Sequence, residues 1–293
     1  LEVLRINLIE LKHVNFAWTI KSKVCCKKER NNMKEYKFVR VQIDDHIMSV
    51  TINRPEVYNA VHPPLSLELN EIWDNFGQDK DLWVAVLTGE GDKAFSAGND
   101  LKYSALPVEQ KVQQPLSGFA GLTRRFNRTK PIIAAVNGFA MGGGMETALC
   151  CDIIIASENA KFALPEVKVG FFAAAGGVQR LSRQIGKKAA VEIMLTGRSV
   201  LAAEALELGI INEVVPHSSL MELAMEKAKV IASNCPSSIR YSMEALNHMD
   251  HLENYPDALS KSAELIELLR QTEDHKEGVS AFVEKRKPNW KNQ

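Results

Sequence analysis

The sequence predicts an α/β fold that ends in an all-helical region. Apolar runs of strand length alternate with segments whose apolar residues recur every three to four positions, the pattern of layered strands and helices. The strand signal becomes sparse after about residue 202, and helical periodicity dominates the remainder. The 293 residues are 45% hydrophobic and 25% charged, a composition typical of soluble globular domains.

The predicted elements can be placed in order along the chain. Residue 33 opens a segment that begins to alternate like a strand. Short apolar runs predict strands at residues 47–52, 83–88, 131–136, 153–156 and 210–215. Apolar spacing of three to four predicts helices at residues 65–76, 220–234, 238–247 and 256–273.

We expect three regions. Residues 1–32 carry seven basic and three acidic residues, which fits neither an acid-poor transit peptide nor a secretory signal. We therefore interpret them as an extension outside the fold, either disordered or upstream sequence. Residues 33–230 are expected to form the catalytic α/β domain, and residues 231–293 a helical C-terminal region.

The amino-acid composition argues against several classes of function. Lys plus Arg and Asp plus Glu number 36 each, and this balance argues against a dedicated nucleic-acid binder. No run of about 18 apolar residues predicts a membrane span. Five cysteines, in two adjacent pairs and a singleton, favour a reduced, cytoplasmic protein. His248 and His251 lack further ligands, so we expect no metal site.

The most informative local feature is a run of glycines at residues 142–144, followed by Met145 and Glu146. Glycine inside an element costs roughly 0.5–1 kcal/mol relative to alanine, so three in a row need a backbone reason. A turn that opens a helix offers free N–H donors and a positive dipole end, which favour a developing negative charge. No Gly-Lys-Ser/Thr follows, so the turn is not a P-loop.

Two further segments offer a second backbone amide and a second carboxylate. Residues 97–101, Ala-Gly-Asn-Asp-Leu, follow a predicted strand, and their small side chains would let a ligand approach the Asn99 amide. An ordinary turn with Asp100 near the helix cap fits this segment equally well. Glu166 lies twenty positions after Glu146, and two convergent carboxylates can serve as general base and general acid. The alternative is a pair of surface glutamates, but the apolar surroundings of both disfavour it.

These motifs belong to a longer ordered series that spans residues 35–293. The series comprises residues 53–55, 59–60, 97–101, 131–146, 151–154, 165–166, 176–181, 195–198, 209–212 and 282–286. In this combination the chain resembles the crotonase superfamily, also called the enoyl-CoA hydratase/isomerase family, whose members stabilise thioester enolates of coenzyme A substrates. Within the family, residues 118–123, 162–166 and 284–291 are similar to the branch that contains carnitinyl-CoA dehydratase.

The resemblance implies a fold and a mechanism. The family fold is a crotonase-like spiral of β-β-α turns, with a helical C-terminal region that forms trimers, and trimers commonly pair into hexamers. The family's oxyanion hole maps onto the amides of Asn99 and Gly143, and its catalytic glutamates onto Glu146 and Glu166. Retention of both carboxylates favours reversible addition of water to an α,β-unsaturated acyl-CoA thioester. Glu146 would then activate the water and Glu166 would supply the proton at Cα. Coenzyme A is part of the substrate, and no separate cofactor is expected.

The resemblance also implies residues that bind the substrate. Those expected to contact the acyl-CoA are Arg54, Ala60, Lys93, Ala97, Gly98, Asp100, Leu101, Lys102, Phe282 and Lys285. Phe282 and Lys285 would reach the nucleotide from a neighbouring subunit. Each lysine taken singly also fits a solvated surface charge.

The acyl group is left open by the sequence. Many relatives read Gly-x-x-Pro after the second glutamate, whereas this chain has Gly-Phe-Phe-Ala-Ala-Ala at residues 170–175. An acyl group with a quaternary amine would need aromatic lining, and ordinary packing around an uncharged acyl chain is the alternative. The candidate aromatic residues are Tyr103, Phe119, Phe171 and Phe172.

Two other functions remain open at this stage. One is double-bond isomerisation, or carnitinyl-CoA dehydration, on the same scaffold. The other, from a different class, is a non-catalytic CoA-binding or RNA-binding role. The zero net charge and the two intact glutamates argue against the second.

Overall fold

The computed structural model describes residues 34–251 and 254–293. The extension that we predict at residues 1–32 lies outside the described residues, as does the side chain of His251. Within the described part of the chain, none of the helices has both the length and the apolarity needed to cross a bilayer.

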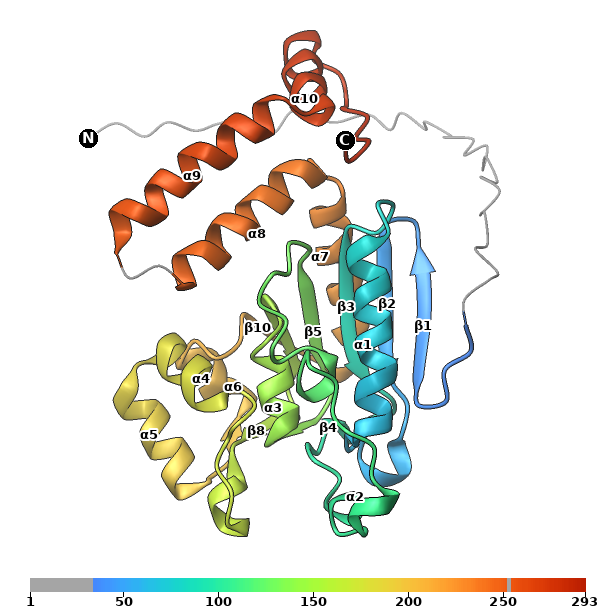
Figure 1. The fold of residues 1–293 in the computed structure, drawn as a ribbon, viewed down its shortest axis with the longest axis vertical. Coiled ribbons are helices and arrows are strands. Elements are labelled where there is room, and N and C mark those ends of the chain that lie inside the picture. The colour runs from blue at the N-terminus through green and yellow to red at the C-terminus, as the bar shows by residue number, and fades with distance from the viewer. Residues whose placement is uncertain (1–33, 252–253) are drawn as a thin grey trace, which may run out of the picture. The chain divides into compact units, whose positions relative to one another are not determined.

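The main sheet has six strands in the order β1-β2-β3-β5-β7-β10 (Figure 1). Its strands are β1 (Val39–Asp44), β2 (Ile47–Ile52), β3 (Val84–Gly89), β5 (Ile132–Val136), β7 (Ile153–Ser157) and β10 (Glu213–Val215). Only β1 and β2 pair antiparallel; the other neighbours in this sheet are parallel. Mixed strands and helices in this order confirm the predicted α/β class.

The central strands are apolar throughout because both faces of the sheet are covered. Along β3, Val84 and Val86 pack into a cluster with helix α7 (Leu220–Ala232), whereas Ala85 and Leu87 pack into the larger cluster on the other face. This explains why the strand signal in the sequence is a continuous apolar run rather than an alternation.

A second, smaller sheet runs in the order β4-β6-β8-β9. Its strands are β4 (Ala94–Ser96), β6 (Phe139–Met141), β8 (Lys161–Ala163) and β9 (Val200–Leu201). The chain passes from β3 to β4, from β5 to β6 and from β7 to β8, so successive turns add one strand to each sheet. The ends of β4, β6 and β8 are therefore neighbours, although they are far apart in the sequence.

Helices cover the sheets and form the C-terminal part of the chain (Figure 1). Before residue 210 they are α1 (Pro63–Gln78), α2 (Leu101–Ser104), α3 (Gly143–Ala148), α4 (Gly177–Ile185), α5 (Lys187–Thr196) and α6 (Ala202–Glu207). After it, α7 is followed by α8 (Pro236–His251), α9 (Tyr255–Arg270) and α10 (Glu273–Glu284).

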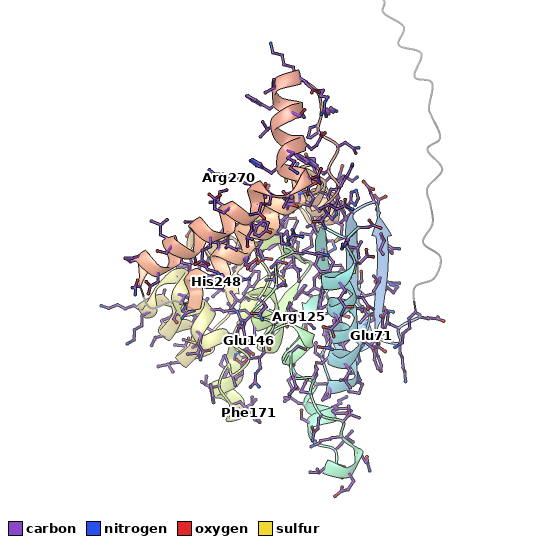
Figure 2. The ribbon with its side chains drawn as sticks, turned by 45° about the horizontal axis from the view of Figure 1, so that its top comes forward. Glu71, Arg125, Glu146, Phe171, His248 and Arg270 are labelled. Carbon is purple, nitrogen blue, oxygen red and sulfur yellow. The ribbon has the colours of Figure 1, made fainter. Side chains whose placement is uncertain are left out.

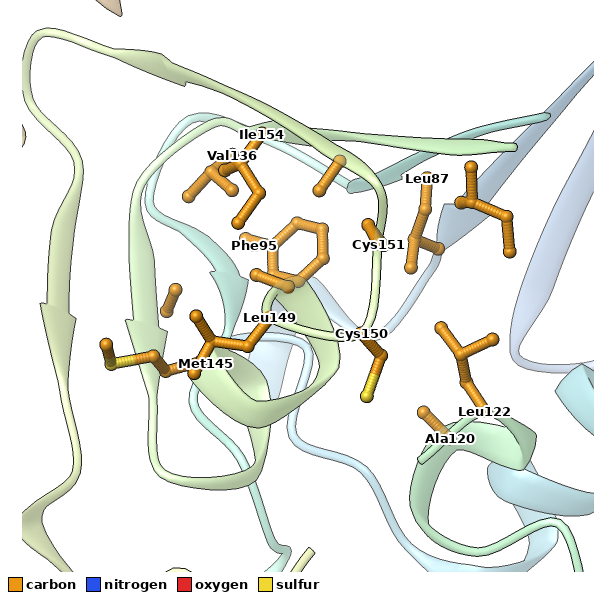
Figure 3. Packing of buried hydrophobic residues seen from close by; sticks show 14 of the residues in the cluster. Leu87, Phe95, Ala120, Leu122, Val136, Met145, Leu149, Cys150, Cys151 and Ile154 are labelled. Atoms are coloured by element: carbon orange, nitrogen blue, oxygen red, sulfur yellow. The ribbon is translucent and has the colours of Figure 1, made fainter. Parts of the chain in front are cut away.

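The short helix α3 lies inside the core. All six of its residues are buried, and Met145 belongs to the main hydrophobic cluster with Leu149 and Phe95 (Figure 3). A helix this short gains little stability from its own hydrogen bonds. Tertiary packing therefore fixes the position of its first turn.

Several predicted boundaries differ from the structure, such as the helix predicted at residues 238–247, which spans Pro236–His251, and two of the errors have identifiable reasons. The strand predicted at residues 210–215 begins only at Glu213, because Ile210 and Ile211 are buried in the turn after α6, where the Ile210 N–H donates to the Ala205 carbonyl at 2.8 Å. The helix predicted at residues 256–273 ends at Arg270, and the chain restarts as α10 with Thr272 as its N-cap.

Candidate active site

The first component of the site is the turn that follows β4. Gly98 has a φ of +85°, and a Cβ there would lie 2.4 Å from the Met141 carbonyl oxygen and 2.9 Å from the Gly143 nitrogen. Only glycine allows this approach. The turn after β4 is thereby held directly against the glycine turn after β6.

The Asn99 amide is left available by its neighbours. Val61 donates to the Gly98 carbonyl at 2.7 Å and accepts from the Asp100 N–H at 2.9 Å, so Asn99 sits in a short parallel bridge. Among the residues that the structure describes, the Asn99 N–H has no backbone or side-chain acceptor. A bound oxyanion could take that place.

The glycine turn supplies the second set of amides. Gly142 has a φ of +51° and precedes α3, whose N-terminus has no side-chain cap. A Cβ at Gly143 would lie 2.6 Å from the Phe119 ring, and one at Gly144 would lie 2.1 Å from the Ser96 carbonyl oxygen. Close packing on both sides is the backbone reason for the glycines, and the N–H of Gly143 belongs to the unsatisfied first turn of α3.

Glu146 enters the site from α3. Its side chain is almost fully buried, with the residue 3% exposed, and Figure 2 labels its place within the molecule. The Gly177 N–H donates to Oε1 at 2.8 Å, and the nearby Ala175 N–H also favours the charged form of the carboxylate. Burial raises the pKa of Glu146 to about 7, and the charge of Glu166 adds to that rise, although the two backbone donors oppose it.

Glu166 reaches the same place from the 3₁₀ turn η4 (Pro165–Val169), which follows β8. Its carboxyl group lies against Gly142, where a Cβ would be 3.0 Å from Oε1. Oε2 is buried and has no hydrogen-bond partner among the described residues. Burial raises the pKa of this carboxyl group as well. An unpartnered buried oxygen of this kind is costly in a purely structural role.

The arrangement can handle protons beside a growing negative charge. A buried carboxyl group, Glu146, and a half-buried one, Glu166, both with raised pKa values, sit beside the Asn99 and Gly143 amides, which have no acceptor among the described residues. Glu146, whose pKa is about 7, can both take and give protons at physiological pH. Fixed amide donors stabilise an oxyanion without reorganisation.

Arg54, Ala60 and Asp100 form a structured edge next to Asn99. Arg54 Nη2 pairs with Asp100 Oδ2 at 2.9 Å, and Nη1 donates to the Ala60 carbonyl at 2.5 Å. Asp100 also caps α2 by accepting from the Tyr103 N–H at 3.1 Å. Burial opposes ionisation, but the Tyr103 and Arg54 hydrogen bonds prevail and lower the pKa of Asp100. The predicted cap is therefore present, and Arg54 is engaged within the protein.

The other predicted binding residues lie on the surface. Ala97 and Leu101 flank the Asn99 turn and are exposed, and Lys93 and Lys102 are exposed nearby in sequence. Phe282, 86% exposed, and Lys285 lie at the end of α10. The structure does not bring α10 into contact with the two glutamates.

The predicted aromatic residues occupy different places. Phe119 lies against Gly143, beside the predicted oxyanion amide. Tyr103 packs edge-on against His62 and accepts from the Val112 N–H. Phe171 and Phe172 are about two-thirds exposed, at 66% and 65%, and Phe171 points outward on a projecting segment (Figure 2).

Two residues with a place in the site have no role assigned from the sequence. They are Gly177, whose N–H holds Glu146, and Arg180, whose guanidinium donates to Ala175 and Thr123. The available signal was the glycine pair at residues 176–177 with an arginine one helical turn later. Gly177 bonds to Glu146 across 31 positions and Arg180 to Thr123 across 57, and no local pattern reveals either contact.

Comparison with known proteins gives consistent matches. The family model described as "Enoyl-CoA hydratase/isomerase" matches residues 42–293. The chain is 42% identical to an (E)-benzylidenesuccinyl-CoA hydratase of Thauera aromatica, covering 86% of this chain and 98% of the relative. It is 43% identical to the mevalonyl-coenzyme A hydratase sidH of Aspergillus fumigatus, covering 84% and 92%. It is 42% identical to a carnitinyl-CoA dehydratase of Salmonella typhi, covering 84% and 95%.

Solved structures agree with these relatives. The crystal structure of an enoyl-CoA hydratase from Mycobacterium tuberculosis superposes with a TM-score of 0.82 at 34% identity, covering 87% of this chain and 99% of that one. An enoyl-CoA hydratase from Bacillus anthracis gives a TM-score of 0.81 at 35% identity, covering 88% and 100%. The spiral fold implied by the sequence is thereby confirmed.

Proposed function

This chain belongs to the enoyl-CoA hydratase/isomerase family and is a hydratase-type carbon–oxygen lyase, and on that premise we propose that Glu146 and Glu166 catalyse the addition of water to an α,β-unsaturated acyl-CoA. The observation that carries this assignment is that both carboxyl groups lie beside the Asn99 and Gly143 amides, for which the described part of the chain offers no acceptor. The raised pKa values of the two glutamates support proton transfer by both.

The proposed reaction balances without a redox partner or a separate cofactor. Water oxygen bonds to Cβ as the Cα–Cβ π electrons move onto the thioester, and Glu146 takes the proton that the water loses. The enolate oxygen accepts hydrogen bonds from the Asn99 and Gly143 amides. Glu166 then gives its proton to Cα, and the thioester carbonyl is restored. Proton exchange with solvent returns the carboxyl pair to its starting state.

The division of labour follows from the surroundings of each carboxyl group. Glu146 accepts from the Gly177 N–H, and the Ala175 N–H also favours its charged form, which suits a base that orients water. Glu166 Oε2 is buried without a partner, which favours a carboxyl group that carries a proton. The charge of Glu166 also raises the pKa of Glu146, so the state with one proton on the pair, carried by Glu166, is the one that starts hydration.

Hydration and isomerisation can be separated by experiment. The wild type should add water to crotonyl-CoA, whereas Glu146→Gln and Glu166→Gln should each lose about 10²–10⁴-fold in kcat, the usual contribution of a positioned acid or base. The measurement is the loss of conjugated-thioester absorbance, with product identification. A wild type that moves double bonds without adding water would assign the chain to isomerisation instead.

The residues near Asn99 are proposed to bind the CoA moiety. Ala97, Gly98 and Leu101 shape the turn, and Arg54 with Asp100 fixes the Ala60 carbonyl beside it. Lys93 and Lys102 are proposed to meet the phosphates, and Phe282 with Lys285 the nucleotide of a neighbouring subunit. Lys93→Ala and Lys102→Ala should raise KM for acyl-CoA without lowering kcat; unchanged KM in both would remove them from this role.

The acyl group is proposed to be substituted beyond the crotonyl skeleton. The names of the three relatives describe acyl groups with aromatic, hydroxyl or quaternary ammonium substituents, and Phe119 stands where an acyl chain bound at Gly143 would pass. A panel containing crotonyl-CoA, an aryl-substituted enoyl-CoA and a trimethylammonium enoyl-CoA ranks these choices by kcat/KM. Highest kcat/KM for unsubstituted crotonyl-CoA would overturn this proposal.

We further propose that the protein assembles as a homotrimer or homohexamer and works in the cytoplasm. Apolar side chains at Leu259 on α9 and at Val279, Phe282 and Val283 on α10 are more than half exposed in the single chain. Phe282 and Val283 lie three and four residues after Val279, on one face of α10, and exposed apolar patches commonly mark an interface. Cys150, Cys151 and Cys235 are free thiols, which suits a reducing compartment; fractionation of the native cells tests the location.

A further inference from the structure

Arg180 links two loops on either side of the proposed site. It lies one turn into α4 and is half-buried. Its Nη2 donates to the Thr123 carbonyl at 2.9 Å, and its Nη1 to the Ala175 carbonyl at 3.2 Å. The planar guanidinium suits this double contact because its donors are held in a fixed fork.

The Ala175 end of this link holds Glu146. The Gly177 N–H donates to the Glu146 carboxylate at 2.8 Å, and the Ala175 N–H favours the charged form of the same group, while the carbonyl of Ala175 accepts from Arg180. The guanidinium thus holds the turn from the side opposite to the carboxylate. If the turn shifts, both donors to Glu146 shift with it.

The glycine pair at residues 176–177 is explained by these two neighbours. Gly176 has a φ of +107°, and a Cβ there would lie 1.9 Å from Arg180 Nη1. At Gly177 a Cβ would lie 3.0 Å from Glu146 Oε1 and 2.7 Å from the Ala173 methyl group. One glycine makes room for the guanidinium and the next makes room for the carboxylate.

The Thr123 end of the link belongs to the turn that carries Phe119. The Thr123 N–H donates to the Phe119 carbonyl at 3.2 Å, and the Phe119 ring lies against Gly143. Arg180 therefore ties the turn that flanks the oxyanion amide to the turn that holds the base.

We propose that Arg180 is a positioning residue for Glu146, which it serves by clamping the Ala175–Gly177 turn to the Phe119 turn. This inference rests on the proposed function of Glu146 as the base that orients water. The positive charge of Arg180 also acts on Glu146 and lowers its pKa against the effect of burial. The other titratable groups that act on Glu146 are Glu166 from η4 and the Cys150 thiol at the end of α3.

The test compares Arg180→Gln and Arg180→Lys with Arg183→Gln as the matched control. Arg183 lies on the same helix, is exposed, and loses the same charge. Arg180→Gln should lower kcat about 100-fold, the effect of a displaced catalytic group, with KM for crotonyl-CoA changed less than about two-fold because no substrate contact is lost. Arg183→Gln should match the wild type.

The pH profile separates positioning from a general loss of structure. Ionised Glu146 is the active base, so removal of the Arg180 charge should move the acidic limb of kcat/KM to higher pH. Arg180→Lys keeps the positive charge, so the acidic limb of its kcat/KM profile should match that of the wild type. Its kcat should be reduced, because an ammonium group cannot reproduce the forked hydrogen bonds of the guanidinium. An Arg180→Gln profile identical to that of Arg183→Gln would overturn the inference.

A second readout does not depend on activity. Carbon-13 labelling of glutamate, with Glu146→Gln to assign the signal, follows the Glu146 titration directly in each variant. Arg180→Gln should raise the titration midpoint and Arg183→Gln should leave it unchanged; equal midpoints would reject the inference even in a chain that hydrates nothing. If Arg180→Gln does not fold, Arg180→Lys still decides, because wild-type kcat in that variant contradicts the need for the fork.

Discussion

At the scale of single residues, the site depends on two carboxyl groups whose burial costs folding stability. Glu146 is almost fully buried and its pKa is about 7, against an ordinary value of 4.5. Glu166 keeps one oxygen buried without a partner. Both features reduce stability and make sense where the groups exchange protons with a substrate.

The raised pKa of Glu146 predicts a pH-dependent stability. The folded state binds the proton on Glu146 more tightly than the unfolded state does. The stabilisation of the folded state by this proton is therefore fully present below pH 4.5 and is lost as the pH rises through about 7. Glu146→Gln should therefore be more stable than the wild type at pH 8, by up to about 3 kcal/mol, and should lose this advantage toward pH 4.

Thermal unfolding across pH checks this expectation. Glu222→Gln is the control, since Glu222 is an exposed glutamate in the first turn of α7. It should show no such change with pH. If Glu146→Gln and Glu222→Gln behave alike at every pH, burial of Glu146 does not cost stability.

Gly98 makes a second prediction at this scale. Gly98→Ala should cost more stability than Gly91→Ala, and it should abolish hydration activity. Both glycines have left-handed backbones, at φ +85° and +82°, and this strain alone costs on the order of 1–3 kcal/mol in a side-chain-bearing residue. A Cβ at Gly91 meets nothing within 4 Å, whereas one at Gly98 overlaps the Met141 carbonyl.

Comparison of Gly98→Ala with Gly91→Ala separates the effect of steric overlap from that of backbone strain. Urea unfolding of both variants gives the difference directly, and activity assays show whether the two oxyanion turns have separated. Equal free energies of unfolding for Gly98→Ala and Gly91→Ala would mean that the turns after β4 and β6 are not packed as described.

At the scale of elements, sequence reasoning succeeded where the signal was local. The apolar runs of β2, β3, β5 and β7 and the periodicity of α1 predicted those elements closely, and the glycine turn indicated the start of α3. The three-residue strands β4, β6 and β8 were not predicted. They are too short for any periodicity to emerge, and each pairs with a strand that is far away in the sequence.

The same distinction applies to the site. The carboxylates, the glycine turn and the Asn99 amide could be proposed from residue type and spacing, and the family resemblance favoured Asn99 over an ordinary turn and singled out Gly143. Gly177 and Arg180 could not be assigned roles, because Gly177 bonds to Glu146 and Arg180 to Thr123, and both partners are far away in the sequence. The packing of Phe119 against Gly143 was likewise invisible in the sequence.

The short helix α2 gives a prediction about an element. Asp100 caps this helix and pairs with Arg54, whose side chain is only 12% exposed. Asp100→Ala should cost about 3–5 kcal/mol, because it removes the cap and leaves a nearly buried charge unpaired. Asp100→Asn keeps the capping oxygen and should cost less.

Chemical denaturation of the two variants separates the cap from the ion pair. KM for acyl-CoA in Asp100→Asn shows whether the edge beside Asn99 has been kept. Near-wild-type stability in Asp100→Ala would contradict a structural role for the Arg54–Asp100 pair.

At the scale of the whole molecule, the exposed apolar side chains of α9 and α10 predict self-association. Light scattering should give the mass of three or six chains, each of 32.6 kDa. Phe282→Asp should shift the distribution toward smaller species, because it places a charge in the proposed interface. Ser280→Asp, a change on the same helix at a polar position, is the matched control. A wild type that stays monomeric at high concentration would contradict the assembly.

The central claim is that two glutamates and two amides add water to a CoA thioester, and one measurement tests it most directly. Crotonyl-CoA is incubated with the enzyme in isotopically labelled water, and the product is analysed by mass for the label. We predict a labelled 3-hydroxyacyl-CoA from the wild type and its near absence from both Glu146→Gln and Glu166→Gln. The account would be contradicted if the wild type gave only an unlabelled thioester with the mass of the crotonyl-CoA supplied. It would also be contradicted if the wild type and both variants incorporated the label equally.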